Sequence, residues 1–394
     1  MPSSVLMPNS LVLSGEWLYG ADADLVVWLR DARTGHLRWR YSLERVEKGS
    51  EYYPQLIVAK GQVFVGGGFN DVTGELTALC AADGRRMWRH AFPESIHDIT
   101  HFRDTVVAVT RTSVCGMSAV DGEVLWQTRI APVRMGWEWM APHGSALLMS
   151  SRSDGVLALE GSTGQEKWSL PNPEPTDYTE NIEHHAAGGY IYAIGSRMVE
   201  APIPQSDGSV VNGWKSIDGE VRTVSAATGH SQWTRTLPPL GSSLANGSFL
   251  YLVSGDLLLA LHSHSGATAW SVPLQGPEVH LMVHDGLLLV ILPVPDKGDR
   301  YPILGLDPKT GEERWRLGME HPTHPPTAGP PGMALLTTIH QSAKLIAVDT
   351  SVGEVIWSTP VKKDVALIAG GDLVYTYDGH IAAYDISTGN SLSG

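Results

Sequence analysis

The chain has 394 residues, a formal net charge of −14 and 42% hydrophobic residues. Nucleic-acid-binding proteins present a basic face, so this acidic balance argues against a nucleic-acid partner and against an anionic membrane surface. The two cysteines, Cys80 and Cys115, are too few for a disulfide framework, and we expect both to be buried free thiols.

The N-terminal residues contain no positively charged segment followed by an apolar core, and no apolar stretch is long enough for a transmembrane helix. We therefore expect no secretory signal, no membrane span and a cytoplasmic location. No linker rich in proline or serine divides the sequence. We expect residues 1–394 to form a single domain.

One motif, Gly-x-x-x-Trp, organises the whole sequence. It occurs eight times, at Gly35/Trp39, Gly84/Trp88, Gly122/Trp126, Gly164/Trp168, Gly229/Trp233, Gly266/Trp270, Gly311/Trp315 and Gly353/Trp357. A ninth copy, ending at Gly389, keeps the turn and lacks the tryptophan. Successive tryptophans lie 37 to 49 residues apart, except for 65 residues between Trp168 and Trp233. Such a period predicts a solenoid, a propeller or another repeat array.

The pattern inside each repeat favours a propeller. Alternating segments such as Leu76–Ala81 and Gln62–Val65 precede the motif, and no stretch shows a sustained 3.6-residue period. Four short strands per repeat are typical of a propeller blade. We expect the glycine to supply a positive φ between the third and fourth strands, and the tryptophan to cover the gap between neighbouring blades.

These repeats resemble those of the PQQ-repeat propellers, a family that includes quinoprotein alcohol dehydrogenases and the outer-membrane assembly lipoprotein of the BAM complex. The resemblance covers about residues 10 to 390 and implies an all-β, eight-bladed propeller of four-stranded antiparallel blades. We expect the first repeat, from Leu11 to Leu43, to have no inner strand and the last, from Val365 to Ser387, to have no outer one. We therefore expect the ring to be closed by strands shared between the termini.

Three blades, taken in chain order, carry enlarged connections between their second and third strands. These lie at Gly66–Gly74, at about 195–222 and at Pro293–Tyr301, and we expect all three to project from one face as a binding surface. The largest, at 195–222, is rich in turn residues and is predicted to be a loop insertion, with a small hairpin inside the loop as the alternative. Its Trp214 either fixes this loop to the blade or forms part of a lid over the channel mouth.

The starts of the inner strands are rich in polar and aromatic residues. The candidates for acid–base roles are His97, Glu180, His184 and His280. The candidates for ligand binding, including Trp214 of the insertion, are Tyr52, Tyr53, Trp137, Glu138, Trp139, Tyr178, Trp214 and His324. The same aromatic residues are equally suited to packing in the channel wall.

Two histidine pairs, His97 with His101 and His280 with His284, are four residues apart and would share one face of a strand. Imidazoles near carboxylates can bind a metal ion, yet a histidine at such a turn more often hydrogen-bonds a backbone carbonyl of the next blade. We predict no metal site and no cofactor, with a bound metal as the open alternative.

The chemistry of the quinoprotein relatives is not expected here. Those enzymes use adjacent cysteines and a calcium ligand set beside PQQ, and this sequence has no Cys-Cys pair and no matching ligands. It also contains no phosphate-binding loop, no Gly-x-Ser-x-Gly elbow, no His-Glu-x-x-His and no Cys-x-x-Cys.

Two hypotheses for the function follow. The first is a non-catalytic scaffold that captures a protein segment or a small ligand on the loop face at the channel mouth. The alternative is a propeller enzyme of specialised or carbohydrate metabolism, with an acid–base and optionally metal-assisted site in that mouth.

Overall fold

The computed structural model describes residues 11–21, 25–43, 54–69, 73–130, 139–151, 154–172, 182–204, 209–274, 279–292, 300–320, 322, 325–338, 343–362, 366–377 and 381–392. These residues form 35 strands, arranged in antiparallel sheets of strands consecutive in the chain. None of them belongs to a helix with the length and apolarity that a membrane span requires. The fold is an all-β propeller of four-stranded antiparallel blades.

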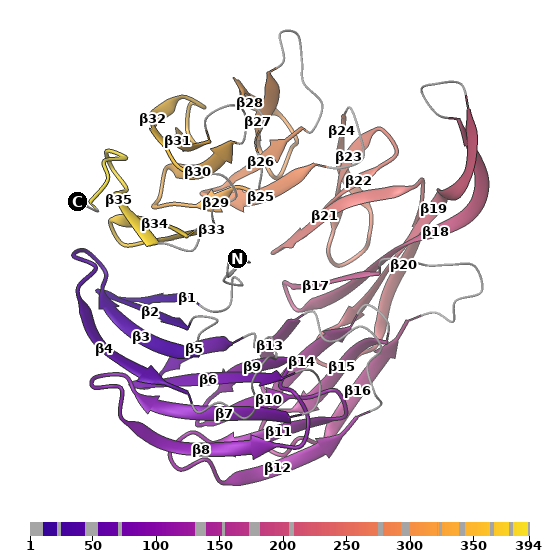
Figure 1. The fold of residues 1–394 in the computed structure, drawn as a ribbon. Coiled ribbons are helices and arrows are strands. Elements are labelled where there is room, and N and C mark those ends of the chain that lie inside the picture. Colours follow the sequence, from indigo (N-terminus) through magenta and orange to yellow (C-terminus); the bar gives the residue numbers. More distant parts are fainter. Residues whose placement is uncertain are drawn as a thin grey trace. The chain divides into compact units, whose positions relative to one another are not determined.

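The chain divides into two compact units, and each sheet is numbered below as a blade in chain order. The first unit comprises Met1–Ser169 with Val361–Gly394, and the second comprises Leu170–Pro360. Figure 1 shows the sheets of blades 2, 3 and 4 side by side within the first unit.

The first unit contains blades 1 to 4 and blade 9. Blade 1 consists of β1 (Leu11–Ser14), β2 (Trp17–Ala21), β3 (Val26–Asp31) and β4 (Leu37–Ser42). Blade 2 consists of β5 (Gln55–Ala59), β6 (Gln62–Phe69), β7 (Thr73–Cys80) and β8 (Arg86–Phe92). Blade 3 consists of β9 (Asp98–Phe102), β10 (Thr105–Val109), β11 (Ser113–Ser118) and β12 (Val124–Arg129). Blade 4 consists of β13 (Trp139–His143), β14 (Ala146–Ser151), β15 (Gly155–Glu160) and β16 (Glu166–Pro171). Blade 9 consists of β33 (Ala366–Gly370), β34 (Leu373–Tyr377) and β35 (Ile381–Asp385).

The second unit contains blades 5 to 8. Blade 5 consists of β17 (Glu183–Ala187), β18 (Tyr190–Pro204), β19 (Val210–Ser225) and β20 (Ser231–Leu237). Blade 6 consists of β21 (Leu240–Asn246), β22 (Phe249–Ser254), β23 (Leu257–His262) and β24 (Thr268–Pro273). Blade 7 consists of β25 (His280–His284), β26 (Leu287–Ile291), β27 (Tyr301–Leu306) and β28 (Glu313–Met319). Blade 8 consists of β29 (Thr327–Ala328), β30 (Met333–Thr338), β31 (Lys344–Asp349) and β32 (Val355–Pro360).

The described residues form nine blades, so the expectation of eight blades closed by shared strands was wrong. Blade 1 has its own inner strand, β1, and in the described part of the chain no strand from one terminus joins a sheet of the other. Blade 9 is a separate three-stranded sheet, extended on its outer side by a single bridge between Tyr384 and Ser391. The tryptophan motif identifies eight blades, and blade 9 escaped this count because its copy has no tryptophan.

The residue pattern of each strand follows from what covers it. The second strands β10 and β26, for example, are buried at every position and apolar except for Thr105, because the sheets on both sides cover them. The fourth strands, such as β12 and β32, have one buried central tryptophan between exposed neighbours, because their outer edge faces solvent. Each strand type therefore has its own hydrophobic pattern.

The tryptophans connect each blade to the next within a unit. The indole nitrogen of Trp88 donates a hydrogen bond to the carbonyl of Ala119 at 2.9 Å, and its ring lies against Gly122 of the same turn. A Cβ added at Gly122, whose φ is +74°, would lie 2.6 Å from Cε3 of Trp88. Equivalent indole-to-carbonyl bonds join the next blade from Trp39 to Ala81, Trp233 to Ser263, Trp270 to Pro308 and Trp315 to Thr350. Glycine is required at these turns by both its positive φ and the ring above it.

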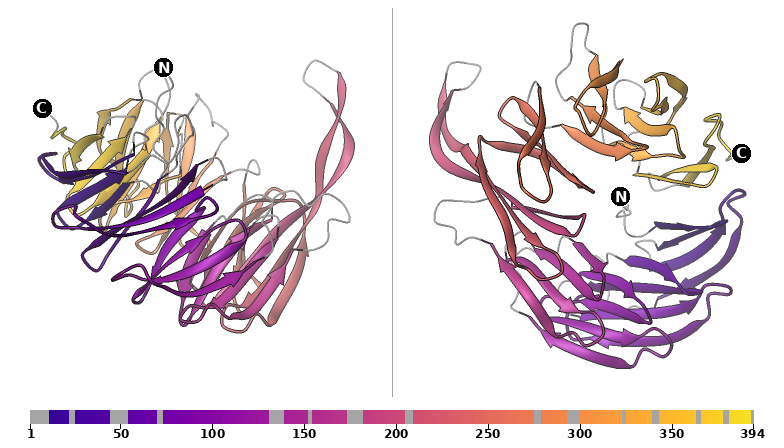
Figure 2. Two further views of the ribbon diagram at one scale, coloured as in Figure 1. Left: turned by 60° about the horizontal axis from the view of Figure 1, so that its bottom comes forward. Right: turned by 180° about the vertical axis from the view of Figure 1, so that it is seen from behind.

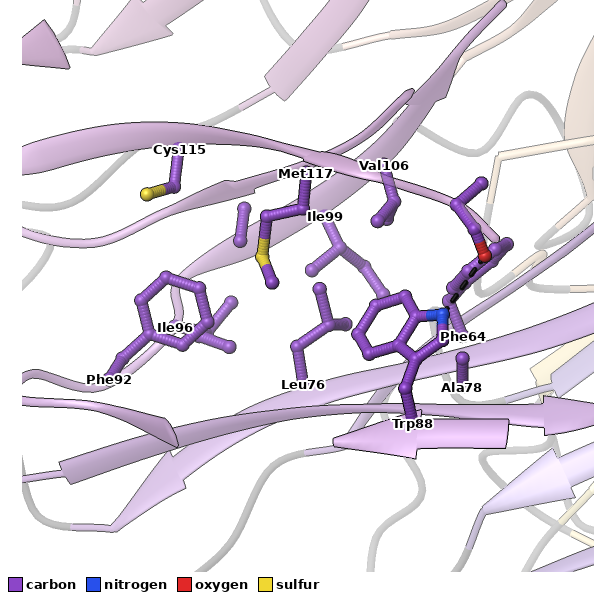
Figure 3. Close-up of a cluster of buried hydrophobic side chains, with 12 residues drawn as sticks. Phe64, Leu76, Ala78, Trp88, Phe92, Ile96, Ile99, Val106, Cys115 and Met117 are labelled. Atoms are coloured by element: carbon purple, nitrogen blue, oxygen red, sulfur yellow. Dashed lines mark hydrogen bonds between the residues drawn. The ribbon is translucent and has the colours of Figure 1, made fainter. Parts of the chain in front are cut away.

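Each interface between neighbouring blades of one unit also holds a hydrophobic cluster. Figure 3 shows the cluster between blades 2 and 3, where Leu76 and Met117 lie beside the indole of Trp88. Cys115 is buried in this cluster, and burial raises the pKa of its thiol to about 11, whereas Cys80 is half-buried. Both cysteines are free and lie on third strands of adjacent blades, as expected, although only one of them is fully buried.

Blades 9 and 1 meet through a tyrosine in place of the missing tryptophan. The hydroxyl of Tyr375, on β34, donates a hydrogen bond to the carbonyl of Ala32 at 2.7 Å. Ala32 holds the same place before its glycine as Ala81 and Ala119 hold in blades 2 and 3. Leu373 and Tyr375 also pack with Leu11, Leu18 and other residues of blade 1 in one buried cluster.

The insertion of blade 5 at about 195–222 is a long regular hairpin, where the sequence predicted a loop with at most a small hairpin. β18 and β19 pair continuously from Tyr190 opposite Ser225 to Pro204 opposite Val210, with one bulge beside Arg197. Figure 2 shows this hairpin reaching well past the other strands of its blade. The connection at Gly66–Gly74 is likewise mostly strand, in β6 and β7, whereas 293–299 lies outside the described residues.

The indole hydrogen bonds should contribute measurably to stability. We expect Trp88→Phe to lower the free energy of unfolding by about 1 kcal/mol more than Trp126→Phe. The two side chains are equally buried, but the indole nitrogen of Trp126 has no hydrogen-bond partner, so only the first substitution removes such a bond. Urea denaturation of the two variants measures this difference. Equal losses would show that the indole-to-carbonyl bond contributes nothing.

Candidate functional site

Several residues singled out in the sequence lie outside the described part of the chain. These are Tyr52, Tyr53, Trp137, Glu138, Tyr178, Glu180 and His324. Their proposed roles remain predictions. The described candidates belong to two units, with His97 and Trp139 in the first and His184, Trp214 and His280 in the second.

His97 lies just before β9 and not on it, so His97 and His101 do not form the expected pair on one strand. Its backbone takes part in a contact between the inner strands of blades 2 and 3. The Gln55 side chain, on β5, donates to the carbonyl of His97 and accepts a hydrogen bond from the amide of Ile99 at 3.0 Å. One glutamine amide thus joins two inner strands that share no ladder.

Asp98 follows His97 and is mostly buried on β9. Burial raises the pKa of its carboxyl to about 6, although the amide of Ile99, 2.8 Å from Oδ1, opposes this shift. The carboxyl therefore titrates close to neutral pH, where it can exchange protons. No sequence pattern distinguishes this aspartate from the many turn aspartates, because the shift comes from tertiary burial.

His101, on β9, packs face to face with Phe64 at a ring separation of 6.3 Å. Its buried Nε2 has no hydrogen-bond partner, and burial together with Lys60 lowers its pKa. A neutral, stacked imidazole in this position supports the interface between blades 2 and 3. It does not contact the backbone of the next blade, as had been expected for this histidine type.

His184 is the most buried of the catalytic candidates, with 4% of its surface exposed on β17. Burial, together with Arg222 and His185, lowers its pKa to about 4. The imidazole is therefore neutral at physiological pH, and protonating it would oppose folding. This position suits a structural group of the blade core better than a base exposed to substrate.

The neighbouring His185 makes a polar contact that links the inner strands of blades 5 and 6. Nε2 of His185 lies 2.8 Å from Oγ of Ser243 on β21, and Ser243 donates to Oε2 of Glu183 at 2.9 Å. The carboxylate is 3.7 Å from that same Nε2, so it does not orient the ring through Nδ1 as in a serine–histidine–acid triad. Sequence reasoning missed Ser243, which only the packing of β17 against β21 brings to the site.

His280 and His284 occupy the two ends of β25, both half-buried. Nε2 of His284 lies 3.4 Å from the carbonyl of Pro330 in blade 8 and 3.2 Å from Asp285. The expected contact between a turn histidine and the next blade is confirmed here. Across the described residues, no three histidine, cysteine or acidic side chains come together as a metal site.

The remaining described candidates are aromatic. Trp139 is half-buried at the start of β13, opposite Ser150, and Trp214 lies on β19 opposite Glu200 in the hairpin of blade 5. The two residues belong to different units. The histidine–carboxylate pairs on or next to the described inner strands, His185 with Glu183 and His284 with Asp285, both belong to contacts between neighbouring blades.

A surface that the sequence analysis overlooked lies at the other end of the strands. Blade 3 exposes Val120 (71%), Val124 (40%) and Leu125 (54%) around the turn between β11 and β12. In the second unit, blade 8 exposes Val352, Val355 and Ile356 in the same region. Aligning the Gly-x-x-x-Trp motifs would have found both groups, because blade 4 has Ser162, Glu166 and Lys167 at the positions of the blade 3 residues.

Comparison with known proteins gives a family match over most of the chain. The family model described as "Outer membrane protein assembly factor BamB" matches residues 23–216, 217–300 and 300–392. A comparison with curated proteins gives no match.

Solved structures with TM-scores above 0.5 show the same fold at low identity. The computationally designed Ika8 protein is 12% identical, with 98% of this chain and 97% of that chain covered and a TM-score of 0.56. The quinohemoprotein alcohol dehydrogenase of Comamonas testosteroni is 13% identical, with coverage of 97% and 72% and a TM-score of 0.52. BamB from Moraxella catarrhalis is 15% identical, with coverage of 89% and 96% and a TM-score of 0.49.

The raised pKa of Asp98 predicts a specific pH dependence of stability. Below about pH 4 the carboxyl is protonated in both folded and unfolded states, and as pH rises to about 6 the unfolded chain ionises first, which costs stability. Asp98→Asn should therefore raise the free energy of unfolding near pH 7 by about 1–2 kcal/mol, and much less near pH 4. Urea unfolding at both pH values measures this effect.

Asp104→Asn provides the control, because Asp104 is exposed and its ion pair with Lys60 lowers the pKa of its carboxyl. It should bring no stabilisation at either pH. A gain for Asp98→Asn that is equal at both pH values would contradict the role given to burial.

Proposed function

The chain belongs to the family of PQQ-repeat propellers described as outer membrane protein assembly factor BamB, and we propose that it is a non-catalytic scaffold that binds a protein partner. The family description names an assembly factor. We carry over the binding of other proteins from that description, and neither a membrane location nor a particular partner.

The observation that carries this proposal is the apolar surface of blade 3, formed by Val120, Val124 and Leu125. All three side chains are aliphatic, all are more than a third exposed, and they surround one turn and the start of the outermost strand. Contiguous exposed apolar groups with a polar surround are typical of protein-binding sites. A free surface of this kind costs solubility, so a bound partner explains its presence.

The fold itself does not need these aliphatic residues. At the same positions blade 4 has Ser162, Glu166 and Lys167, and its tryptophan is buried to the same extent as that of blade 3. Blade 5 has Ser231 and Gln232 at the positions of Val124 and Leu125. Packing within the blade therefore does not account for the apolar surface of blade 3.

The overall charge restricts the kind of partner. A chain with a net charge of −14 repels acidic proteins over most of its surface and favours a neutral or basic partner that presents aliphatic side chains. At the channel mouth, the site expected from the sequence, seven of the candidate residues lie outside the described ranges, namely Tyr52, Tyr53, Trp137, Glu138, Tyr178, Glu180 and His324. Binding there remains a prediction.

The enzymatic alternative has less support. Among its candidates, His184 is buried with a lowered pKa, His97 precedes its strand, and Glu180 is outside the described residues. His280 lies in the second unit, apart from His97 of the first. No observation on these residues favours a particular reaction.

Replacing two residues of the apolar surface tests the proposal. We expect Val124→Glu/Leu125→Lys, which copies blade 4, to weaken binding of the partner at least about tenfold, because a single buried aliphatic group contributes more than 1 kcal/mol. The partner is first captured from the source cells with the wild-type chain and identified. Binding of the purified partner is then titrated by calorimetry.

The matched control is Ser231→Glu/Gln232→Lys, which makes the same change at the same positions of blade 5. It should leave both binding and thermal stability unchanged. Capture of no protein above background by the wild-type chain would refute the scaffold. Equal binding by the wild type and the blade 3 variant would refute this surface.

A further inference from the structure

The turn at Gly35 in blade 1 has the conformation of a tryptophan-binding turn. Six turns, at Gly84, Gly122, Gly164, Gly266, Gly311 and Gly353, have φ values of 66° to 74° and hold the ring of the tryptophan from the preceding blade. Gly35 has a φ of +67° and the same place in its motif. The backbone at Gly35 therefore has the conformation that holds a tryptophan ring at the six other turns.

No ring lies on the Gly35 turn. A Cβ added at Gly35 would have no atom within 4 Å, whereas at the six other turns it would lie 2.2–2.6 Å from a tryptophan ring. The cause is the ninth motif, which lacks its tryptophan. The hydroxyl of Tyr375 donates the hydrogen bond to Ala32 that a tryptophan would donate. The Tyr375 side chain is buried on β34, however, and does not cover Gly35.

Four arginines lie close to this turn in the sequence, at positions 30, 33, 38 and 40. Arg30 donates to the carbonyl of Gly35 at 2.8 Å, with its guanidinium 5.4 Å from the ring centre of Trp28. Arg38 and Arg40 project from β4 as exposed side chains, and neither has a carboxylate partner among the described residues. Arg33 forms an ion pair with Asp372 of blade 9.

Two acidic residues lie beside the turn: Asp31, and the exposed Glu16, whose backbone carbonyl accepts a hydrogen bond from the amide of Ala32 at 2.9 Å. Asp31 accepts hydrogen bonds from the amides of Arg33 and Thr34 at 3.0 and 2.7 Å, and these bonds lower the pKa of its carboxyl. The turn thus has a local excess of positive charge within a chain of net charge −14. Such a reversal of sign favours an acidic ligand at this place.

We propose that the Gly35 turn is a docking site for an aromatic side chain, tryptophan above all, carried by an acidic segment of a partner protein. The six occupied turns identify the aromatic group, because each seats an indole on a glycine of the same conformation. Arg38 and Arg40 identify its acidic surroundings, since guanidinium groups pair well with carboxylates. This inference rests on the proposed function in one respect, namely that the ligand is a protein.

A labelled peptide tests the site without knowledge of the partner. The probe is the pentapeptide Glu-Asp-Trp-Asp-Glu with blocked ends and a dye, and its binding to the full-length chain is followed by fluorescence anisotropy. We expect saturable binding with a Kd at or below about 1 mM. The same peptide with alanine for tryptophan, or with lysines for the acidic residues, should bind at least about tenfold more weakly.

Two variants of the protein locate the binding. Gly35→Ala places a methyl group where the ring would lie, and Arg38→Glu/Arg40→Glu reverses the local charge, so each should weaken binding at least about tenfold. Gly15→Ala controls for strain, because Gly15 also has a positive φ, +60°, and open space. Arg111→Glu/Arg129→Glu controls for charge at exposed arginines of blade 3.

Three results would overturn the proposal. The first is no saturable binding up to about 5 mM peptide. The second is an equal loss of peptide affinity in the variants and in their controls. The third is an affinity for N-acetyltryptophanamide equal to that for the peptide, which would show that the acidic residues contribute nothing. The blade 3 variant Val124→Glu/Leu125→Lys should bind the peptide like the wild type. The two proposals can therefore be refuted separately: the blade 3 surface can prove wrong while the Gly35 site is supported, and the Gly35 site can prove wrong while the blade 3 surface is supported.

Discussion

The contact between a tryptophan ring and the glycine turn of the next blade is the interaction on which this structure depends. A single blade is a small sheet whose middle strands are apolar on both faces, so it is stable only between neighbours. At five described interfaces the indole supplies both apolar cover and one hydrogen bond to a carbonyl of the next blade. The glycine makes room for it and adopts the positive φ that its turn requires.

The other contacts between neighbouring blades differ from one interface to the next, and they include polar side chains. Gln55 joins two inner strands in the first unit, and Ser243 with His185 joins two in the second. These polar contacts occupy many of the histidines and acids that resemble catalytic groups. Among the described residues, the two surfaces proposed for partner binding lie at the turns between third and fourth strands. They are the aliphatic residues of blade 3 and the uncovered Gly35 turn of blade 1. The proposed binding role therefore follows from exceptions to the repeat.

Much of the fold was predictable because the repeat leaves a strong pattern. The glycine and tryptophan of each motif, the apolar second strands and the exposed fourth strands all follow from local chemistry, and the propeller follows from their period. The blade number was not predictable from this marker, since Tyr375 replaces a tryptophan from a different strand. The segment 195–222 was predicted to be mainly a loop because its prolines and glycines are typical of turns. Pro202 and Pro204 are tolerated because they lie in the part of β18 that pairs with β19 and not with β17.

The candidate site was less accessible from sequence than the fold. Titration of Asp98 near neutral pH and the burial of His184 depend on what surrounds them, and Ser243 is close to His185 only in the folded state. Val124 and Leu125 fit the apolar pattern of a strand, and only alignment with the same positions of other blades shows that polar residues can take their place. A repeat protein thus reveals its scaffold through what recurs, and its function through positions where the recurrence fails.

The most direct measurement is the stability of Gly122→Ala compared with Gly35→Ala. Both glycines have a positive φ, so both substitutions cost about 1 kcal/mol of backbone strain, but only Gly122 lies under a tryptophan ring. We expect Gly122→Ala to lose at least about 1–3 kcal/mol more than Gly35→Ala, as for overpacking of a core. Equal losses in urea denaturation would mean that the tryptophan contact does not hold the blades together.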